Sequence, residues 1–142
     1  EGAPVRTAHA MLHPGHEEKG SRSLEFTGAV LLPKGEIVPG TSMVRLKDLF
    51  NVNVAWDGEV PSFSYGGDSL ADARAAKAKI IQWLPAQASL PCTLLTQDGE
   101  MKGACEPAVK SEAGNVVQFE RVAFARIDAA DKHGIRAYFT HT

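Results

Sequence analysis

Short runs of alternating apolar and polar residues, separated by turn-forming residues, make up most of the chain. Such alternation predicts half-buried β-strands, because successive side chains of a strand point to opposite faces. It predicts strands over residues 23–32, 43–55, 79–84, 92–95, 116–121 and 136–141. Turns are predicted at Pro33-Lys34-Gly35, Asp98-Gly99-Glu100 and Ala113-Gly114-Asn115.

Residues 68–77 depart from this pattern. The segment begins with Asp68 and Ser69, which are helix-capping residue types, and continues with good helix formers. Its apolar positions are mostly alanine, so it predicts a short helix or an irregular loop. Because the other elements are short strands, and the chain holds 8 prolines and 13 glycines, we predict an all-β barrel or sandwich fold.

Composition narrows the function classes only slightly. The 142 residues are enough for one compact domain or two small ones, and 44% of them are apolar. No apolar run reaches the roughly 18 residues that a membrane-spanning helix needs. The net charge is −2. A protein that relies on phosphate contacts usually carries a basic excess, so any contact with nucleic acid is expected to be local.

Two further features concern processing and compartment. The chain opens with Glu1-Gly2-Ala3-Pro4 rather than with an initiator Met, which favours excision from a longer protein. Nothing at this end resembles a signal peptide. Cys92 and Cys105 have no Cys-x-x-Cys spacing, and we predict free thiols in a reducing cytosol, with a disulfide as the alternative.

The segment His13-Pro14-Gly15-His16 invites a catalytic interpretation. It resembles the His-x-Gly-His signature of class I aminoacyl-tRNA synthetases, and Lys19-Gly20-Ser21-Arg22-Ser23 resembles their Lys-Met-Ser-Lys-Ser loop. Those two elements lie far apart in a nucleotide-binding α/β domain, where both grip ATP phosphates. Here they nearly adjoin, and no strand–loop–helix pattern surrounds them. We therefore predict a loop without catalytic residues.

Metal binding by His9, His13 and His16 is the other interpretation of this stretch. Their spacing suits one face of a helix, but Pro14-Gly15 breaks any helix there, and we expect solvated loop histidines and no metal site. His133 and His141 are isolated, and we expect surface or packing roles for them. No Gly-x-Ser-x-Gly elbow and no recognisable Cys/His pair supports a nucleophilic enzyme.

Polar and basic residues on the predicted strands are the remaining candidates. Arg45 and Lys47 are two positions apart and project from one face of a strand. Gln118 and Glu120 share one face of their strand, and Arg121 lies on the other. Gln118 and Arg121 can meet one ligand only if the strand bends or ends near Glu120. Spacing alone favours side chains that simply face water.

The order of several sequence blocks resembles the C-terminal region of archaeal glutamyl-tRNA synthetases and, more distantly, of glutaminyl-tRNA synthetases. The resemblance extends over nearly all of residues 9–141. The blocks that carry it are Gly20-Ser21-Arg22, residues 44–52, Ile80-Ile81-Gln82-Trp83, Glu106-Pro107, and Val116-Val117-Gln118-Phe119-Glu120-Arg121-Val122 running on to Arg126-Ile127-Asp128.

This resemblance implies that residues 1–142 are an anticodon-binding region without the catalytic domain. It implies two small antiparallel β-barrels packed together, with few short helices. The parent would be a cytoplasmic ligase that joins glutamate to tRNA with ATP and Mg, whereas this fragment itself would need no cofactor. Its expected partner is the anticodon loop of tRNA-Glu, with other synthetases as candidate partners and neither DNA nor a membrane.

The resemblance also assigns an RNA-binding role to certain residues. Gln118 matches a glutamine that contacts the middle anticodon base, and Arg121 matches an arginine of the same pocket. Arg45 and Lys47 match basic residues near the first base in the glutaminyl branch, although Lys47 replaces an arginine and lacks its bidentate geometry. An arginine that the family places just before this chain is absent, and the loop leading into Val44 differs, so no third-base contact is carried over.

Other functions stay open beside this RNA-recognition module. One is a β-barrel protein-interaction appendage of a synthetase complex, and another is the anticodon module of a glutaminyl-tRNA synthetase. A small metal-dependent hydrolase built on residues 9–16 is the third.

Overall fold

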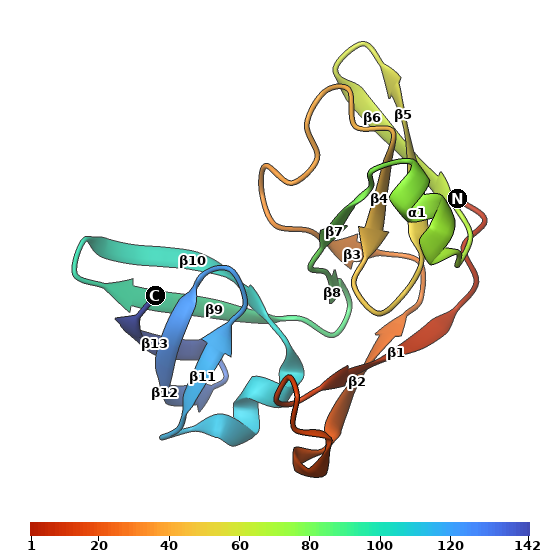
Figure 1. The fold of residues 1–142 in the computed structure, drawn as a ribbon. Helices are drawn as coiled ribbons and strands as arrows, with labels where there is room; N and C mark the ends of the chain where they lie inside the picture. The colour runs from red at the N-terminus through yellow and green to blue at the C-terminus, as the bar shows by residue number, and fades with distance from the viewer. The chain divides into compact units, whose positions relative to one another are not determined.

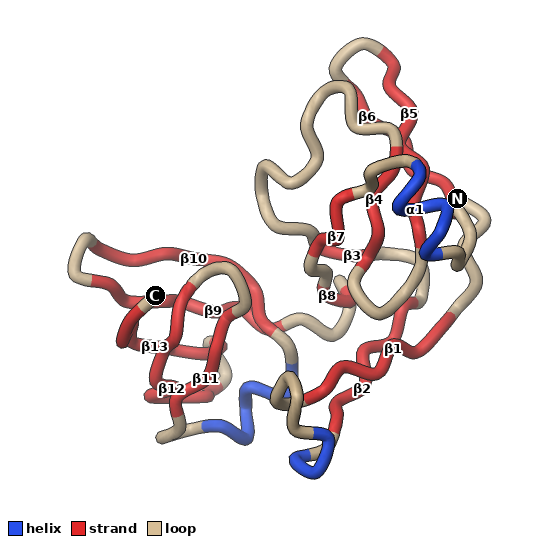
Figure 2. The backbone as a smooth tube through the Cα atoms, viewed as in Figure 1, coloured by secondary structure: helices blue, strands red, loops and turns tan.

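The chain forms two compact units, Glu1–Ala86 (unit 1) and Gln87–Thr142 (unit 2), in a computed structural model that describes residues 1–142. Strands are the main regular secondary structure in both units (Figure 1, Figure 2). The single α-helix is six residues long. This confirms the prediction of an all-β chain with few short helices. None of its helices has the length and apolarity to cross a membrane.

Unit 1 contains three small sheets. Its strands are β1 (Arg6–Met11), β2 (Ser21–Phe26), β3 (Val30–Leu31), β4 (Met43–Leu46), β5 (Asn51–Asp57), β6 (Val60–Tyr65), β7 (Lys79–Ile81) and β8 (Leu84–Pro85), and its helices are η1 (Glu17–Lys19) and α1 (Leu70–Ala75). The largest sheet has the linear order β6-β5-β4-β7, in which β7 runs parallel to β4. β1 pairs with β2 and β3 pairs with β8.

Aromatic side chains fill the core of unit 1. Phe26 and Phe50 meet edge to face with ring centroids 5.0 Å apart, and Trp83 packs against Phe26 at 6.5 Å. The indole Nε1 of Trp83 donates to the backbone oxygen of Lys47 at 2.9 Å, which satisfies the one polar group of that buried side chain. The turn that contains Lys47 is therefore attached directly to the core.

Unit 2 is one five-stranded sheet. Its strands are β9 (Leu90–Thr96), β10 (Gly99–Cys105), β11 (Val116–Phe119), β12 (Ala123–Asp131) and β13 (Gly134–His141), and its helix is η2 (Pro107–Glu112). Their linear order is β10-β9-β13-β12-β11, with β13 parallel to β9. The core is formed largely by small residues, among them Ala123, Ala125 and Ala137.

Gly134, the first residue of β13, lies where the backbone of β13 approaches that of β9 closely. Its φ is 114°, a conformation that residues with a Cβ rarely adopt. A Cβ at this position would overlap the backbone carbonyl oxygen of Pro91 in β9. Only glycine fits here.

Several predicted strands have the wrong bounds. The strand predicted over 43–55 is two strands, β4 and β5, joined by a tight turn in which Asp48 has a φ of 58°. Leu46, Leu49 and Phe50 are all buried, and one straight strand cannot direct all three to one side. The strand predicted over 23–32 breaks at Gly28, whose φ is 119°. The one predicted over 79–84 splits into β7 and β8.

Other elements agree with the sequence or were missed by it. The segment 68–77 contains the helix α1, capped by Ser69, whose Oγ accepts from the backbone N–H of Asp72. The predicted Asp98-Gly99 turn joins β9 to β10. The alternation analysis missed the four strands β1, β6, β10 and β12. The loop predicted over residues 13–23 contains the short helix η1 and ends at Gly20, because β2 begins at Ser21.

Both cysteines are buried in unit 2 with free thiols, as predicted. Cys92 on β9 is opposite Gly103, and Cys105 is opposite Leu90, so the two thiols are diagonal neighbours on the core face. Their mutual hydrogen bond and burial raise the pKa of Cys105, because a thiolate buried there loses its hydration.

Candidate nucleic-acid interface

Arg45 lies on β4 with its guanidinium held on one side. Its Nη1 donates to Oδ1 of Asn51 at 2.8 Å and to the backbone oxygen of Asp68 at 3.1 Å. Both bonds come from one nitrogen, whereas a guanidinium carries five N–H donors in a planar fork. These two bonds fix the direction of the fork.

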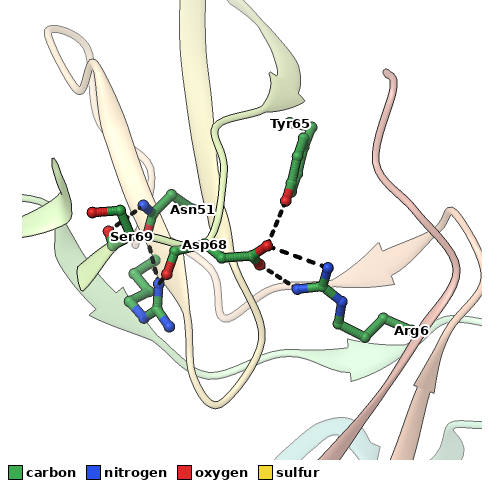
Figure 3. Close-up of polar contacts among 6 residues, drawn as sticks. Arg6, Asn51, Tyr65, Asp68 and Ser69 are labelled. Carbon is green, nitrogen blue, oxygen red and sulfur yellow. Dashed lines mark hydrogen bonds and ion pairs between the residues drawn. The ribbon is translucent and has the colours of Figure 1, made fainter. Parts of the chain in front are cut away.

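Asn51 is the buried polar side chain that organises this corner of unit 1. Its side chain is 0% exposed, and its Nδ2 donates to the backbone oxygen of Ser69 at 2.8 Å (Figure 3). Its backbone N–H donates to the oxygen of Gly67, and its backbone oxygen accepts from Gly66, both at 2.8 Å. One residue therefore attaches the segment before α1 to Arg45.

Asp68 is the second residue that accepts a hydrogen bond from Arg45. Its carboxylate forms a bidentate ion pair with Arg6 and accepts a hydrogen bond from the Tyr65 hydroxyl at 2.8 Å (Figure 3). These bonds, that of Arg6 foremost, lower the pKa of Asp68, and the hydrogen bond that Tyr65 donates to Asp68 raises the pKa of Tyr65. The ion pair is partly exposed, so its effect on stability is modest. It holds Asp68, whose backbone oxygen receives Arg45.

The prediction that Lys47 lies on the same strand as Arg45 is wrong, because β4 ends at Leu46. The residue is half-buried in the following turn. Its backbone N–H donates to the oxygen of Ile81 at 3.0 Å. Arg45 and Lys47 therefore do not share a strand face, and their positions are set by different contacts.

Gln118 is exposed on β11 of unit 2. Its neighbours Val117 and Phe119 pack against the core of that unit, so the Gln118 side chain points outward. It lies directly opposite Phe124 of β12. This placement agrees with the strand prediction and leaves the Gln118 amide accessible to a ligand.

Arg121 lies outside β11, in the turn that leads to β12. The strand predicted over 116–121 ends at Phe119, and the N–H of Val122 donates to the oxygen of Phe119 at 2.8 Å. Arg121 has a φ of 63° in this turn. The strand thus ends before Glu120, so Gln118 and Arg121 do not lie on opposite faces of one strand.

The histidines near the N-terminus pair with local partners in the β1–β2 hairpin. The rings of His13 and His16 meet edge to face at 4.5 Å. Nδ1 of His16 lies 2.7 Å from Oε1 of Glu18, and this bond lowers the pKa of the carboxyl group. Nδ1 of His9 lies 3.2 Å from the Ser23 hydroxyl. No group of three or more His, Cys, Asp or Glu residues is arranged to hold a metal ion.

The site residues that the sequence analysis overlooked are Asn51 and Asp68. Asn51 could have been noticed in the sequence, because asparagine is depleted in strands and Asn51 is the first residue of one. Asp68 could not, because the sequence marks it only as a residue type that caps helices. Chemically, the exposed amide of Gln118 and the oriented guanidinium of Arg45 can form hydrogen bonds to base edges and phosphate oxygens.

Comparison with known proteins identifies related sequences over the whole chain. Two models with the same description, "tRNA synthetases class I (E and Q), anti-codon binding domain", match residues 1–65 and 80–128. The glutamate–tRNA ligase of Methanoculleus marisnigri is 60% identical over 99% of the chain, and that of Methanoregula boonei is 53% identical over 99%. The enzyme of Pyrococcus abyssi is 37% identical over 99%.

The chain spans 25%, 33% and 26% of the length of these three relatives, respectively. The first matched segment lies within unit 1. The second begins in the last strands of unit 1 and continues through most of unit 2. Together the two segments cover most of the chain. The chain therefore belongs to the family of anticodon-binding domains of class I tRNA synthetases (E and Q).

Proposed function

We propose that this chain is the anticodon-reading part of a glutamate–tRNA ligase and binds the anticodon loop of tRNA-Glu. The observation that carries the proposal is the match along 99% of the chain to archaeal glutamate–tRNA ligases, joined to the anticodon-binding description of the matching family. The parent ligase works in the cytoplasm and uses ATP and Mg. In this proposal that chemistry is assigned to other parts of the ligase, since the chain spans only 25% and 33% of two of its relatives.

The exposed polar side chains support a reading mechanism that does not need a basic surface. Proteins recognise single-stranded RNA loops by drawing unstacked bases into pockets and bonding to their edges. The Gln118 amide both donates and accepts, which suits the mixed edge of a uracil. Arg121 provides a fork for carbonyl or phosphate oxygens, and Arg45 presents a fork already oriented by Asn51. Lys47 contributes a point charge.

A fluorescence titration with a labelled tRNA-Glu anticodon stem-loop tests the proposal. A lost bidentate contact to a base edge costs about 1–3 kcal/mol, so Gln118→Ala is expected to weaken binding about 5- to 150-fold. Arg121→Ala is expected to weaken it as well. Gln97→Ala is the matched control, because Gln97 is an exposed glutamine in the β9–β10 turn. Unchanged affinity in both Gln118→Ala and Arg121→Ala would contradict the assigned site.

The same assay separates the competing functions. The matching family covers both E and Q synthetases, so the glutaminyl enzyme is the second candidate parent. Clearly tighter binding to a tRNA-Gln stem-loop than to the tRNA-Glu stem-loop would favour it. No binding to either RNA, together with co-purification of another synthetase, would favour a protein-interaction appendage instead.

A further inference from the structure

An aromatic pair lies on the outward face of the unit 2 sheet, and one of its members, Phe124, lies beside Gln118. Phe124 of β12 and His141 of β13 stack face to face, with ring centroids 4.5 Å apart and an angle of 9° between the planes. Phe124 is flanked by Ala123 and Ala125, which point into the core. Its ring therefore lies on the outer face, where it is directly opposite Gln118 in the β11–β12 pairing.

A β-bulge in β13 creates this pair. Ala125 is opposite Phe139 whereas Phe124 is opposite His141, so Thr140 is an extra residue between two paired positions. Its hydroxyl donates to the backbone oxygen of Phe124 at 2.9 Å. Under regular alternation His141 would point to the same side as Phe139, which packs against the core. Bulges re-aim side chains and are over-represented beside functional sites.

The pair is accessible and has a cation nearby. His141 is exposed and Phe124 is half-buried, and neither belongs to the core of unit 2. Arg126 lies two positions along β12 on the same face; its side chain is 56% exposed, and its Nη2 lies 3.7 Å from Oδ1 of Asp128. Tyr138 is opposite Arg126 and is 39% exposed. Exposed aromatic rings interleaved with cations are the features by which proteins bind unpaired nucleic-acid bases.

We infer that the Phe124–His141 pair is a stacking platform for one unpaired base of the anticodon loop. The inference rests on the proposed function and deepens it. Phe124 on β12 separates Gln118 on β11 from His141 on β13, so the base that stacks on the open face of His141 is a different base from the one whose edge Gln118 reads.

Binding of the anticodon stem-loop to His141 variants of the 142-residue chain tests this inference. His141→Ala is expected to weaken binding about 5- to 150-fold, the range for loss of one stacked base. His141→Phe is expected to restore affinity to within about threefold of the original chain, because stacking requires a ring and not a charge. His133→Ala removes an exposed histidine from the β12–β13 turn and is the matched control.

Three stem-loops, each with an abasic residue at a different anticodon position, separate stacking from other contacts. With the RNA that lacks the stacked base, His141→Ala is expected to change affinity less than about twofold, since no base remains to stack. An effect of His141→Ala that is equally large with all three RNAs would refute the platform. NMR provides a readout that needs no variant. The ring protons of His141 are expected to shift upfield when the intact stem-loop binds, because the ring current of a stacked base shields them.

The outcomes distinguish the inference from the function on which it rests. If the chain binds the stem-loop and Gln118→Ala weakens binding, while His141→Ala binds normally and its ring protons do not shift, the platform is refuted and the proposed function stands. If His141→Phe fails to restore affinity, the imidazole acts through charge or hydrogen bonding and the stacking platform is wrong. If the original chain does not bind the stem-loop, both fail together.

Discussion

Replacing Asn51 with alanine tests how the candidate site is supported. The substitution removes two side-chain hydrogen bonds of 2.8 Å, one accepted from Nη1 of Arg45 and one donated to the oxygen of Ser69. It also empties part of a side-chain position that is 0% exposed. The segment before α1 and the guanidinium of Arg45 then lose their shared partner. Unit 1 should lose stability, and Arg45 should lose its fixed direction.

The expected loss of stability follows from the two hydrogen bonds that Asn51 makes with Arg45 and Ser69. A hydrogen bond to a charged group contributes about 1.5–3 kcal/mol and one between neutral groups about 0.5–1.5 kcal/mol. Arg45 is only half-buried, so water compensates for part of the first loss. We expect the free energy of unfolding of unit 1 to fall by about 2–3 kcal/mol. Asn51→Asp keeps the acceptor for Arg45 but sets a carboxylate oxygen against the Ser69 carbonyl oxygen, so it should destabilise the unit as well.

Urea unfolding followed by tryptophan fluorescence measures this change. Both tryptophans, Trp56 and Trp83, lie in unit 1, so the signal reports on that unit alone. Asn53→Ala is the matched control, because Asn53 is exposed on the same strand and its Nδ2 makes only a 3.5 Å contact with the Tyr65 oxygen. We expect that control to change the free energy of unfolding by less than about 0.5 kcal/mol.

Two results would refute this reasoning. One is an Asn51→Ala variant whose free energy of unfolding matches that of Asn53→Ala. The other is an Asn51→Asp variant as stable as the original chain, which would mean that the bond from Nδ2 to the Ser69 oxygen contributes nothing. An Asn51→Ala variant that stays folded should also bind the stem-loop more weakly if Arg45 is an RNA contact.

Two further predictions concern stability. Gly134→Ala should lower the free energy of unfolding of unit 2 by about 1–3 kcal/mol from the positive φ, and further from the overlap of the added Cβ with the oxygen of Pro91. Urea unfolding followed by circular dichroism measures this change. Gly103→Ala is its control, since a Cβ there meets nothing within 4 Å, and equal stability of the two variants would contradict the prediction. Arg6 lowers the pKa of Asp68 below its ordinary 3.8, so the ion pair stabilises the folded chain above that pH and loses its effect as the pH falls through the folded-state value. Asp68→Asn should therefore flatten the decline of the urea midpoint of unit 1 below pH 3.8, and an unchanged decline would show that the pair contributes nothing.

The strand class of the chain could be predicted from sequence because alternation is a local property. Gln118 was placed correctly on an exposed strand position, since Val117 and Phe119 on either side are apolar and pack inward. The helix at residues 70–75 was signalled by the Ser69 cap. These features depend on neighbouring side chains within a few positions, which the linear pattern contains.

Strand ends were harder to predict, since a turn can preserve the alternation of the residues around it. The pattern over residues 43–55 looks continuous, yet the chain reverses at Asp48 and removes Lys47 from the strand. Burial of Leu49 and Phe50 against the unit 1 core stabilises that reversal. The core that decides it is assembled from distant segments, including Trp83. Local propensity therefore could not reveal it.

By itself, the sequence determined the all-β class, the capped helix, and the ordered blocks by which the family is recognised. Only the tertiary structure decided that Asn51 joins Arg45 to Ser69 and that His141 stacks on Phe124. Both contacts depend on register between strands or loops far apart in the chain. A single extra residue at Thr140 reverses which face His141 occupies. Side-chain direction in a sheet is thus set by pairing partners, and those partners exist only in the folded chain.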